Sequence, residues 1–561
     1  MAYICCCIPA RIQHALAELP RTLDETYQRT LREINEADWE FAHRLFQFVV
    51  VASRPLRVEE LAELLAFDFT AGPIPKFHED LRLEDPVDAV LSVCSSLLAV
   101  VDVKGSPVIQ FSHFSVKEFL TSTRLAEASD INHRRYHVSM TPAHTLASQA
   151  CLGTLLHLDK DIITFDSLED YRLAKYAAEY WVDHARFEEV SQNVEDGMKQ
   201  LFEPSKPHLT VCIWIHNPGR LWLIRDKRPP PTLESPLHFA ALWGLHSIVH
   251  FLVIEHSQDV CSRNFTNNVT PLHLASQYGH KQVACFLLEH GADVSAQDEG
   301  WKTPLHLALR MGHIDVAYML IERGADVSSQ DEYRDSPLRL ALQMGHIDVA
   351  YMLIERGADV SARDNSGKSP LHLALQKGHI DVTYMLIERG ADISAQDNRG
   401  NSPLHLALEM GNIDVAYMLI ERGADLSAQD TYGRHPLHMA SKEGHIDVAN
   451  MLIERGADVS AQDNSGNSPL HLALQEGHID VAYMLIERGA DVSARDNNGS
   501  TPLDLTSQDE RLVEVAQALI QHSTAPGAHS LTIFTLFSSR LSSTALEPRT
   551  IPTAHADPGL A

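Results

Sequence analysis

Basic residues are scarce in this sequence, and long apolar runs are absent. Its 561 residues include 46 lysines and arginines against 75 aspartates and glutamates, which gives a formal net charge of −29. Nucleic-acid binding rests on lysine and arginine contacts to phosphate, so this balance predicts no nucleic-acid partner. It favours a protein partner, and a basic one would suit the charge. No window offers the roughly 18 consecutive apolar residues that a membrane span needs.

Cysteine is confined to the first half of the chain. None of the eight lies beyond Cys285, and no pair has the C-x-x-C spacing typical of zinc sites. The N-terminus lacks the basic start and apolar core of a secretory signal. Cys5, Cys6 and Cys7 are adjacent, but no myristoylation or prenylation pattern accompanies them. We therefore expect a reducing compartment, the cytoplasm, with the nucleus as the alternative.

Motifs for nucleotide and ester chemistry are missing as well. A P-loop needs G-x-x-x-x-G-K-[S/T], and the only Gly-Lys-Ser, Gly367 to Ser369, has Ala362 at the first glycine position. A lipase-type deacylase needs G-x-S-x-G, which does not occur. His113 and His184 stand in aromatic-rich stretches, where packing is the usual role. The sequence predicts no enzyme activity, no cofactor and no metal site.

What the sequence has instead is a repeat. Nine prolines are spaced first by 35 residues and then by 33 seven times in succession. They are Pro236, Pro271, Pro304, Pro337, Pro370, Pro403, Pro436, Pro469 and Pro502. Around them recur Thr/Ser-Pro-Leu-His, then Gly-His, an apolar stretch and Gly-Ala-Asp. This pattern resembles the ankyrin repeat. The resemblance implies a mainly α-helical solenoid of about nine repeats.

Each part of one copy has a physical role. Ser369 can cap the first helix, and Pro370 lies in its first turn, where a missing N–H costs nothing. Gly378 can end that helix with a positive φ. Val382, Met385 and Leu386 give the second helix a buried stripe, and Gly390 ends it. The repeat histidines recur about one helix spacing, ~8–10 Å, apart, which is too far to share one zinc, so we expect them to serve as hydrogen-bonding groups.

The copies differ from one another mainly in two places. One is the finger, the turn that joins neighbouring repeats, and the other is the end of the first helix. In ankyrin proteins these regions form the concave recognition surface, and Trp, Tyr and Arg are enriched in binding hot spots. We therefore predict a protein-binding groove centred on the finger residues. The predicted partner-binding residues are Trp301, Lys302, Arg310, Met311, Tyr333, Arg334, Lys368, Arg399, Tyr432 and Arg434.

Two other interpretations of these differences remain open. Exposed positions of recently duplicated repeats tolerate drift, since solvated sites matter little for stability. The array could also be a purely structural spacer. Substituting Trp301, Tyr333 and Tyr432 separates the hypotheses, because only a recognition surface would lose a partner.

The first 230 residues contain four characteristic stretches: LPRTLDETY, RPLRVEELAELL, FSHFSVKEFL and YAAEYWVDHA. They resemble the region between the NACHT nucleotide-binding domain and the ankyrin repeats of fungal NLR-like (STAND-type) proteins. Residues 108–120 pass from a strand pattern to a helix pattern. The central part resembles the winged-helix segment named after GPI inositol-deacylase. The resemblance implies a signalling or self/non-self recognition role. Around Asp102, Lys104 and Gly105, the expected wing, no basic cluster supports DNA binding.

The chain departs from that family because the resemblance begins almost at Met1, without a NACHT domain. A non-catalytic adaptor is our first hypothesis. The alternative is a truncated gene model of a nucleotide-dependent switch. The predicted domains are an N-terminal remnant (1–18), a winged-helix-like domain (19–125), a helical linker domain (126–230), the ankyrin array (231–522) and a disordered tail (523–561). In the tail, residues 531–537 could be a short docking segment or translated intron.

Overall fold

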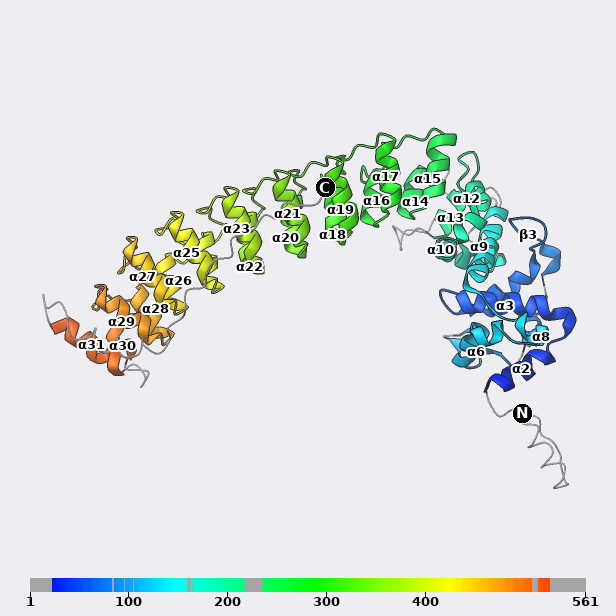
Figure 1. The fold of residues 1–561 in the computed structure, drawn as a ribbon, viewed down its shortest axis with the longest axis horizontal. Helices are drawn as coiled ribbons and strands as arrows, with labels where there is room; N and C mark the ends of the chain where they lie inside the picture. The colour runs from blue at the N-terminus through cyan, green and yellow to red at the C-terminus, as the bar shows by residue number, and fades with distance from the viewer. Residues whose placement is uncertain are drawn as a thin grey trace, which may run out of the picture. The chain divides into compact units, whose positions relative to one another are not determined.

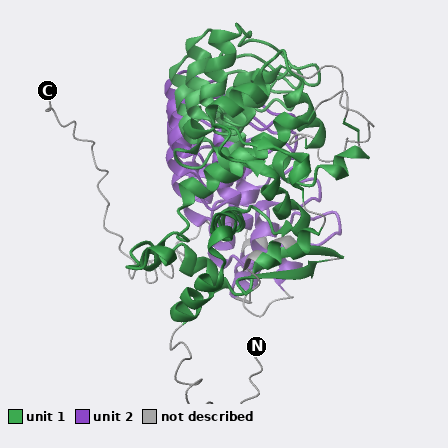
Figure 2. Cartoon of the chain, turned by 90° about the vertical axis from the view of Figure 1, so that its right-hand side faces the viewer, with its two compact units in different colours: residues 1–340 green, residues 341–561 purple. Residues whose placement is uncertain are grey.

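The computed structural model describes residues 23–82, 85–94, 96–103, 105–158, 163–164, 166–216, 235–506 and 513–524. Two compact units divide the chain, residues 1–340 and 341–561 (Figure 2). Several predictions lie outside the described residues: those for residues 1–22, for Lys104, and for the tail beyond Thr524. The predicted mainly helical fold is confirmed.

The winged-helix part combines short helices with a small antiparallel sheet. Its strands run in the order β1-β5-β4, and Ile109 of β5 lies opposite Leu56 on one side and Val100 on the other. The elements are α2 (Leu23–Glu33), η1 (Glu36–Asp38), α3 (Trp39–Val51), β1 (Leu56–Arg57), α4 (Val58–Ala62), η2 (Glu63–Ala66), β2 (Phe67–Asp68), β3 (Lys76–Phe77), η3 (Glu79–Leu81), α5 (Pro86–Cys94), β4 (Leu98–Val103), β5 (Ser106–Phe111), α6 (Phe114–Leu120), α7 (Thr123–Ala126) and α8 (Ile131–Arg134). The predicted change from strand to helix in residues 108–120 is confirmed by β5 and α6.

A buried ion pair fixes the start of α4. The Glu60 carboxylate is fully buried and accepts two hydrogen bonds of 2.7 Å from the Arg54 guanidinium. It also accepts the backbone N–H of Arg57 at 2.8 Å. A buried carboxylate is tolerated only with this degree of compensation. Aromatic rings of α3, led by Phe46 and Phe48, fill the core beside it.

A helical segment follows. Its longest helix, α9, packs against α3 and α10 in the first unit (Figure 1). The elements are α9 (Met140–His157), η4 (Ser167–Asp170), α10 (Ala174–Ala185), α11 (Val190–Asn193), α12 (Glu195–Phe202) and α13 (His208–Ile215). Among the described residues, no helix is long and apolar enough to cross a bilayer.

Helix pairs then recur through residues 235–506 and 513–524. In the first unit, α16 packs on α18 and α17 packs on α19 (Figure 1). The first helices of successive repeats thus stack on one another, and so do the second helices. The first unit contains α14 (Pro236–Leu242), α15 (His246–His250), η5 (Phe251–Glu255), α16 (Pro271–Gln277), α17 (Lys281–Glu289), α18 (Pro304–Met311) and α19 (Ile314–Glu322). The unit boundary falls within α20 (Pro337–Met344).

The second unit continues the same stacking, with α22 on α24, α24 on α26 and α26 on α28. Its helices are α21 (Ile347–Glu355), α22 (Pro370–Lys377), α23 (Ile380–Glu388), α24 (Pro403–Glu409), α25 (Ile413–Glu421), α26 (Pro436–Lys442), α27 (Ile446–Glu454), α28 (Pro469–Gln475), α29 (Ile479–Glu487), α30 (Pro502–Thr506) and α31 (Val513–Thr524). The helix-ending roles predicted for Gly378 and Gly390 are confirmed by φ values of 72° and 83°.

The repeat histidine links each copy to the next. His306 Nδ1 accepts the backbone N–H of Thr303 at 3.2 Å, and Nε2 donates to the carbonyl oxygen of Asp335, in the next finger, at 3.0 Å. Burial lowers the pKa of His306, which favours the neutral ring, and the two hydrogen bonds fix its tautomer. In the second unit, His372, His405, His438 and His471 make the same bond to the finger 29 residues ahead. Their expected role as hydrogen-bonding groups is confirmed.

The terminal copies depart from the pattern. In the first, Ser257 takes the left-handed backbone that glycine takes elsewhere, with φ of 49°. In the last, Asp504 replaces histidine. Its carboxylate accepts the N–H and the hydroxyl of Thr501, both at 2.8 Å. This carboxylate caps the helix.

Candidate protein-binding surface

An aspartate shapes the finger in each repeat from Asp331 onward. In the first unit, Asp331 Oδ1 accepts the backbone N–H groups of Tyr333 and Asp335, both at 2.9 Å. In the second unit the same two bonds are made by the aspartates Asp364, Asp397, Asp430, Asp463 and Asp496. Two bonds to one carboxylate oxygen hold the turn in a single conformation. The finger side chains are therefore presented from a fixed backbone.

Backbone hydrogen bonds also tie neighbouring fingers together. In the first unit, Glu299 N–H donates to Asn267 carbonyl at 2.8 Å, and Glu332 N–H donates to Gly300 carbonyl at 3.0 Å. Fingers of the second unit are joined in the same way. Because a rigid surface loses little entropy on binding, this arrangement suits recognition.

Two predicted residues of the first unit stand on unusual backbone. Trp301 and Arg334 adopt positive φ values of 59° and 61°. At the same finger position the second unit has only glycine, at residues 367, 400, 433, 466 and 499, with φ from 74° to 83°. A side chain in this left-handed region costs about 1–2 kcal/mol. Trp301 and Arg334 therefore each carry a cost in folding stability that the glycine-containing fingers of the second unit avoid.

The same fingers expose large aromatic side chains. Trp301 is 58% exposed and Tyr333 is 55% exposed. Met311, at the end of α18 and between these two residues in the sequence, is also exposed. Sequence comparison missed Phe265, which is 96% exposed in the preceding finger. It also missed Tyr278 at the end of α16. The sequence did contain a signal for Phe265. This residue lies 33 residues before Asp298, at the finger position that aspartate occupies in the later repeats.

The predicted cations of the first unit are mostly paired. Lys302 Nζ lies 3.2 Å from Glu332 Oε1 and 5.7 Å from the centre of the Tyr333 ring. Arg310 lies 3.1 Å from the buried carboxylate of Asp331. Both ion pairs stabilise the finger. Arg334 remains exposed.

The predicted residues of the second unit differ from one another in exposure and in pairing. Tyr432 is exposed, with the Arg434 guanidinium 4.8 Å from its ring centre. Arg434 is half-buried and paired with Asp430 at 2.6 Å. Lys368 Nζ is half-buried and donates to Gln376 Oε1 at 3.1 Å. Arg399 is exposed.

The lone Gly-Lys-Ser lies in a finger. Gly367 has φ of 74°, and Ser369 begins the capping box of α22 with His372. Lys368 is held by its own repeat rather than directed at a phosphate site. In the part of the chain that the structure describes, no group of three or more His, Cys, Asp or Glu side chains could hold a metal ion.

His184 and His113, the two histidines of the aromatic-rich stretches, each contact defined partners. His184 is fully buried, with Nε2 2.9 Å from the Tyr176 hydroxyl and Nδ1 3.0 Å from His144 Nδ1. Burial lowers the pKa of His184 to about 4, and His144 adds to the effect. His113 caps α6 by accepting the N–H of Ser115.

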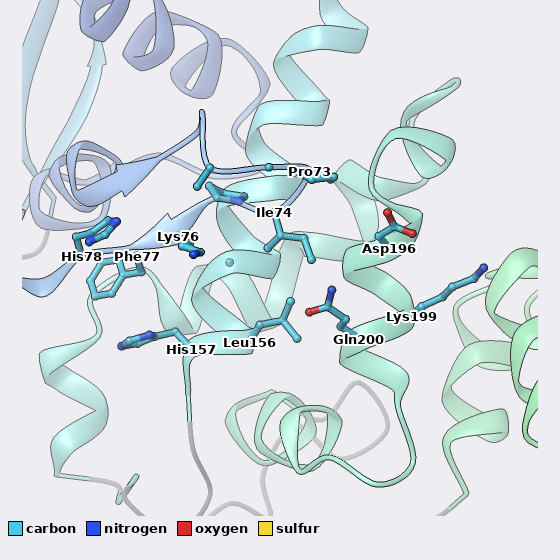
Figure 3. A pocket seen from close by; sticks show the side chains of 14 residues that line it. Pro73, Ile74, Lys76, Phe77, His78, Leu156, His157, Asp196, Lys199 and Gln200 are labelled. Atoms are coloured by element: carbon cyan, nitrogen blue, oxygen red, sulfur yellow. The ribbon is translucent and has the colours of Figure 1, made fainter.

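A cavity of about 740 Å³ lies in the first unit between the loop of residues 71–78 and helices α9 and α12. Figure 3 shows its labelled lining side chains, which come from both sides of this seam. Two of its lining side chains have acidic neighbours: Lys199 Nζ lies 3.0 Å from Glu195 Oε1, and His157 Nε2 lies 3.7 Å from Glu79 Oε1. We assign it no ligand, because no set of polar groups converges on one point.

Comparison with known proteins agrees with this architecture. A family model described as "Ankyrin repeats (3 copies)" matches residues 212–298, 237–331, 296–364, 338–430, 392–463 and 437–529. The chain belongs to the ankyrin-repeat family. A second model, "GPI inositol-deacylase, winged helix domain", matches residues 33–132 of this ankyrin-repeat protein. Ankyrin repeats support a role in protein–protein interaction.

Three relatives share parts of the ankyrin-repeat protein. "Azaphilone pigments biosynthesis cluster protein L" of Monascus ruber is 30% identical over 296 residues, which are 50% of this chain and 61% of that protein. "Alpha-latrocrustotoxin-Lt1a" of Latrodectus tredecimguttatus is 40% identical over 85 residues, 14% of this chain and 6% of the toxin. "Palmitoyltransferase AKR1" of Lachancea kluyveri is 42% identical over 64 residues, 11% and 8% of the two chains. The chain thus spans less than two thirds of each relative.

Proposed function

We propose that this protein is a non-catalytic adaptor that recognises a protein partner through the fingers and first-helix ends of its repeats. The observation that carries the proposal is the left-handed backbone at Trp301 and Arg334. Stability alone favours glycine there, as in the five fingers of the second unit. Costly residues are retained mainly where they serve a function.

The residue types support the same role. Trp, Tyr and Arg are the side chains that dominate binding hot spots, and Trp301, Tyr333 and Arg334 lie in two consecutive fingers of the first unit. Tyr432 is the corresponding exposed aromatic residue of the second unit. Drift alone does not account for a tryptophan at a position where any side chain is strained.

The charge of the surface favours a basic partner. Lys302, Arg310 and Arg434 are neutralised by acidic residues of their own unit, while the chain as a whole carries a net charge of −29. Complementary charge raises the rate of association and selects among partners. We expect no nucleic-acid ligand on the same grounds.

We further propose kinship with fungal NLR-like signalling or self/non-self recognition proteins, acting in the cytoplasm. The order of a winged helix, a helical segment and an ankyrin array supports this relationship. The switch hypothesis makes a different prediction, which transcript sequencing tests: an in-frame P-loop joined upstream of residue 1 would contradict the adaptor role, and its absence from full-length transcripts would support it.

Affinity capture with the full chain tests the recognition surface. The test bait carries Trp301→Gly, Tyr333→Ser and Arg334→Gly, which gives these fingers the residues found at the same positions in the second unit. The control bait carries Tyr318→Asn, because the second helix α27 already has Asn450 at the equivalent position. We expect the finger variant to lose at least one partner that both the wild type and the control retain. Identical partners for all three baits would refute the proposal.

A further inference from the structure

The three-stranded sheet of the winged-helix part has two edges of different length. At one edge, β1 contains only Leu56 and Arg57. At the other edge, β4 runs for six residues, and all six pair with β5 in unbroken register, without a bulge. Among the described residues, no strand pairs with the outer side of β4. The sheet therefore ends on this side at a long, regular edge.

The backbone groups on the outer side of β4 belong to alternate residues. Just before β4, the Leu97 carbonyl oxygen accepts the N–H of Ser112, just after β5, at 2.9 Å. Because the direction of these groups alternates along an antiparallel strand, the odd-numbered residues of β4 bond to β5. Leu98, Val100 and Asp102 direct their N–H and C=O groups outward. In the described part of the chain, these outward groups have no hydrogen-bond partner.

The side chains of β4 do little to protect this edge. Exposed edge strands usually carry lysine, proline or a bulge, whereas β4 reads Leu-Ala-Val-Val-Asp-Val and has one charge, on Asp102. Val101 and Val103 lie on one face of the strand and are 36% and 48% exposed. Asp102 is exposed on the other face. An edge with free backbone groups and exposed β-branched side chains is a template for a further strand.

We propose that the outer edge of β4 binds an extended segment of a partner protein, which joins the sheet as a fourth strand. Residues directly opposite each other in an antiparallel pair lie on the same face and contact each other. Val101 and Val103 therefore select apolar residues in the segment, and Asp102 selects a lysine or arginine. In strand addition of this kind, main-chain hydrogen bonds supply the affinity and the side chains supply the specificity. This surface consists of other residues than the fingers, so it gives the protein a second binding site.

A second copy of β4 fits the edge less well than a partner segment. When two β4 strands pair through their outward groups, each Asp102 lies opposite Leu98, Val100 or the other Asp102. Like charges directly opposite each other are destabilising. A carboxylate against an apolar side chain loses water without gaining a partner. A segment with a basic residue at this position avoids both costs.

Binding of a labelled synthetic peptide to the full chain tests the proposal. The probe is Gly-Val-Lys-Val-Thr-Val-Gly, in which lysine is designed to lie opposite Asp102 and the flanking valines opposite Val101 and Val103. In this register the lysine and threonine amides point toward β4, and the valine amides point away. Fluorescence anisotropy measures the Kd. Methylating the lysine and threonine amide nitrogens should weaken binding at least about tenfold. Methylating two valine amides should leave the Kd within about threefold of the unmodified peptide.

A matched pair of variants tests the same edge from the side of the protein. Val100→Pro removes an outward N–H but no bond to β5, and an edge strand tolerates proline at such a position. Val100→Thr is the control, because it keeps the N–H and a β-branched side chain. We expect Val100→Pro to weaken peptide binding at least about tenfold and Val100→Thr to stay within about threefold of the wild type. The methylated peptides give the same test on the wild-type chain if the proline variant does not fold.

The proposal makes a further prediction for hydrogen exchange, because the added strand supplies acceptors to outward amides. The amides of Leu98, Val100 and Asp102 should exchange more slowly when the peptide is bound. Absence of binding by the unmodified peptide would overturn the proposal, and so would equal losses for the two methylated peptides. A doubled mass of the wild-type chain in light scattering that Val100→Pro abolishes would also overturn it, because a second copy would then cover the edge.

Discussion

Replacing His438 by glutamine should remove part of the acid sensitivity that buried histidines give to the repeats. His438 Nδ1 accepts the backbone N–H of His435 at 3.2 Å, and Nε2 donates to the Asn467 carbonyl at 3.1 Å. Burial lowers the pKa of His438 to about 4, against the opposing effect of the Asn467 hydrogen bond. The nearby His435 lowers the pKa further, and Asp463 raises it.

The sign of the effect follows from proton binding. Histidine in an unfolded chain has a pKa near 6.5, so between that value and about 4 the unfolded state binds the proton first. The stability due to the neutral ring is complete above pH 6.5 and is lost as the pH falls. For His438 the loss is about 2 kcal/mol at pH 5 and about 3 kcal/mol at pH 4. Burial lowers the pKa of His273, His306, His372 and His405 as well, so their contributions have the same sign.

Urea unfolding at pH 7 and pH 5, followed by circular dichroism, measures the difference. Glutamine keeps the capping box but does not titrate, and it should cost about 1 kcal/mol at pH 7 through the lost bond to the next finger. Val448→Ala is the control, because it trims a buried residue of the same repeat and leaves the histidine in place. Wild type and control should lose about 2 kcal/mol more on acidification than His438→Gln. Equal losses in all three proteins would refute the reasoning.

Four further substitutions test the packing, and three of them should be destabilising. Gly400→Ala should destabilise the second unit by about 2 kcal/mol or more, because its Cβ would lie 2.5 Å from a carbonyl oxygen of the next finger at φ of +74°. Arg334→Gly should instead stabilise the first unit by up to about 1 kcal/mol, because the relief of left-handed strain outweighs the extra backbone entropy that glycine loses on folding. Asp397→Ala should cost about 1–3 kcal/mol in urea unfolding, since two finger N–H groups lose their acceptor. Glu60→Ala should cost about 3–5 kcal/mol by leaving the Arg54 guanidinium without its carboxylate; a cost below about 1 kcal/mol in any of the three destabilising variants would contradict its assigned contact.

The fold could be predicted from the sequence because the repeat displays its own periodicity. Proline, histidine and glycine recur at fixed offsets, and each has a local role that needs no knowledge of distant residues. The helix-ending glycines Gly378 and Gly390 were predictable for this reason. Copies of one chain also served as an internal comparison, which located Trp301 and Tyr333 as the variable, exposed positions.

The electrostatic character of the surface was less predictable. Lys302 and Arg310 pair with Glu332 and Asp331, about 30 and 21 residues ahead, through contacts that only stacking creates. The backbone strain at Trp301 could in principle be inferred from the sequence, because glycine occupies the aligned position in five other fingers. Recognising it required the knowledge that this position has positive φ, which the structure supplies.

The central claim is that the fingers recognise a protein partner. It is tested most directly by the affinity of the purified full chain for a partner identified by affinity capture. Titration calorimetry should give a Kd at least about 100-fold weaker for the Trp301→Gly, Tyr333→Ser, Arg334→Gly variant than for wild type, the range expected when hot-spot residues are removed. Tyr318→Asn should bind within about twofold of wild type, a difference of less than about 0.5 kcal/mol. Equal affinity of the finger variant and the wild type, with both proteins folded, would contradict recognition through the fingers.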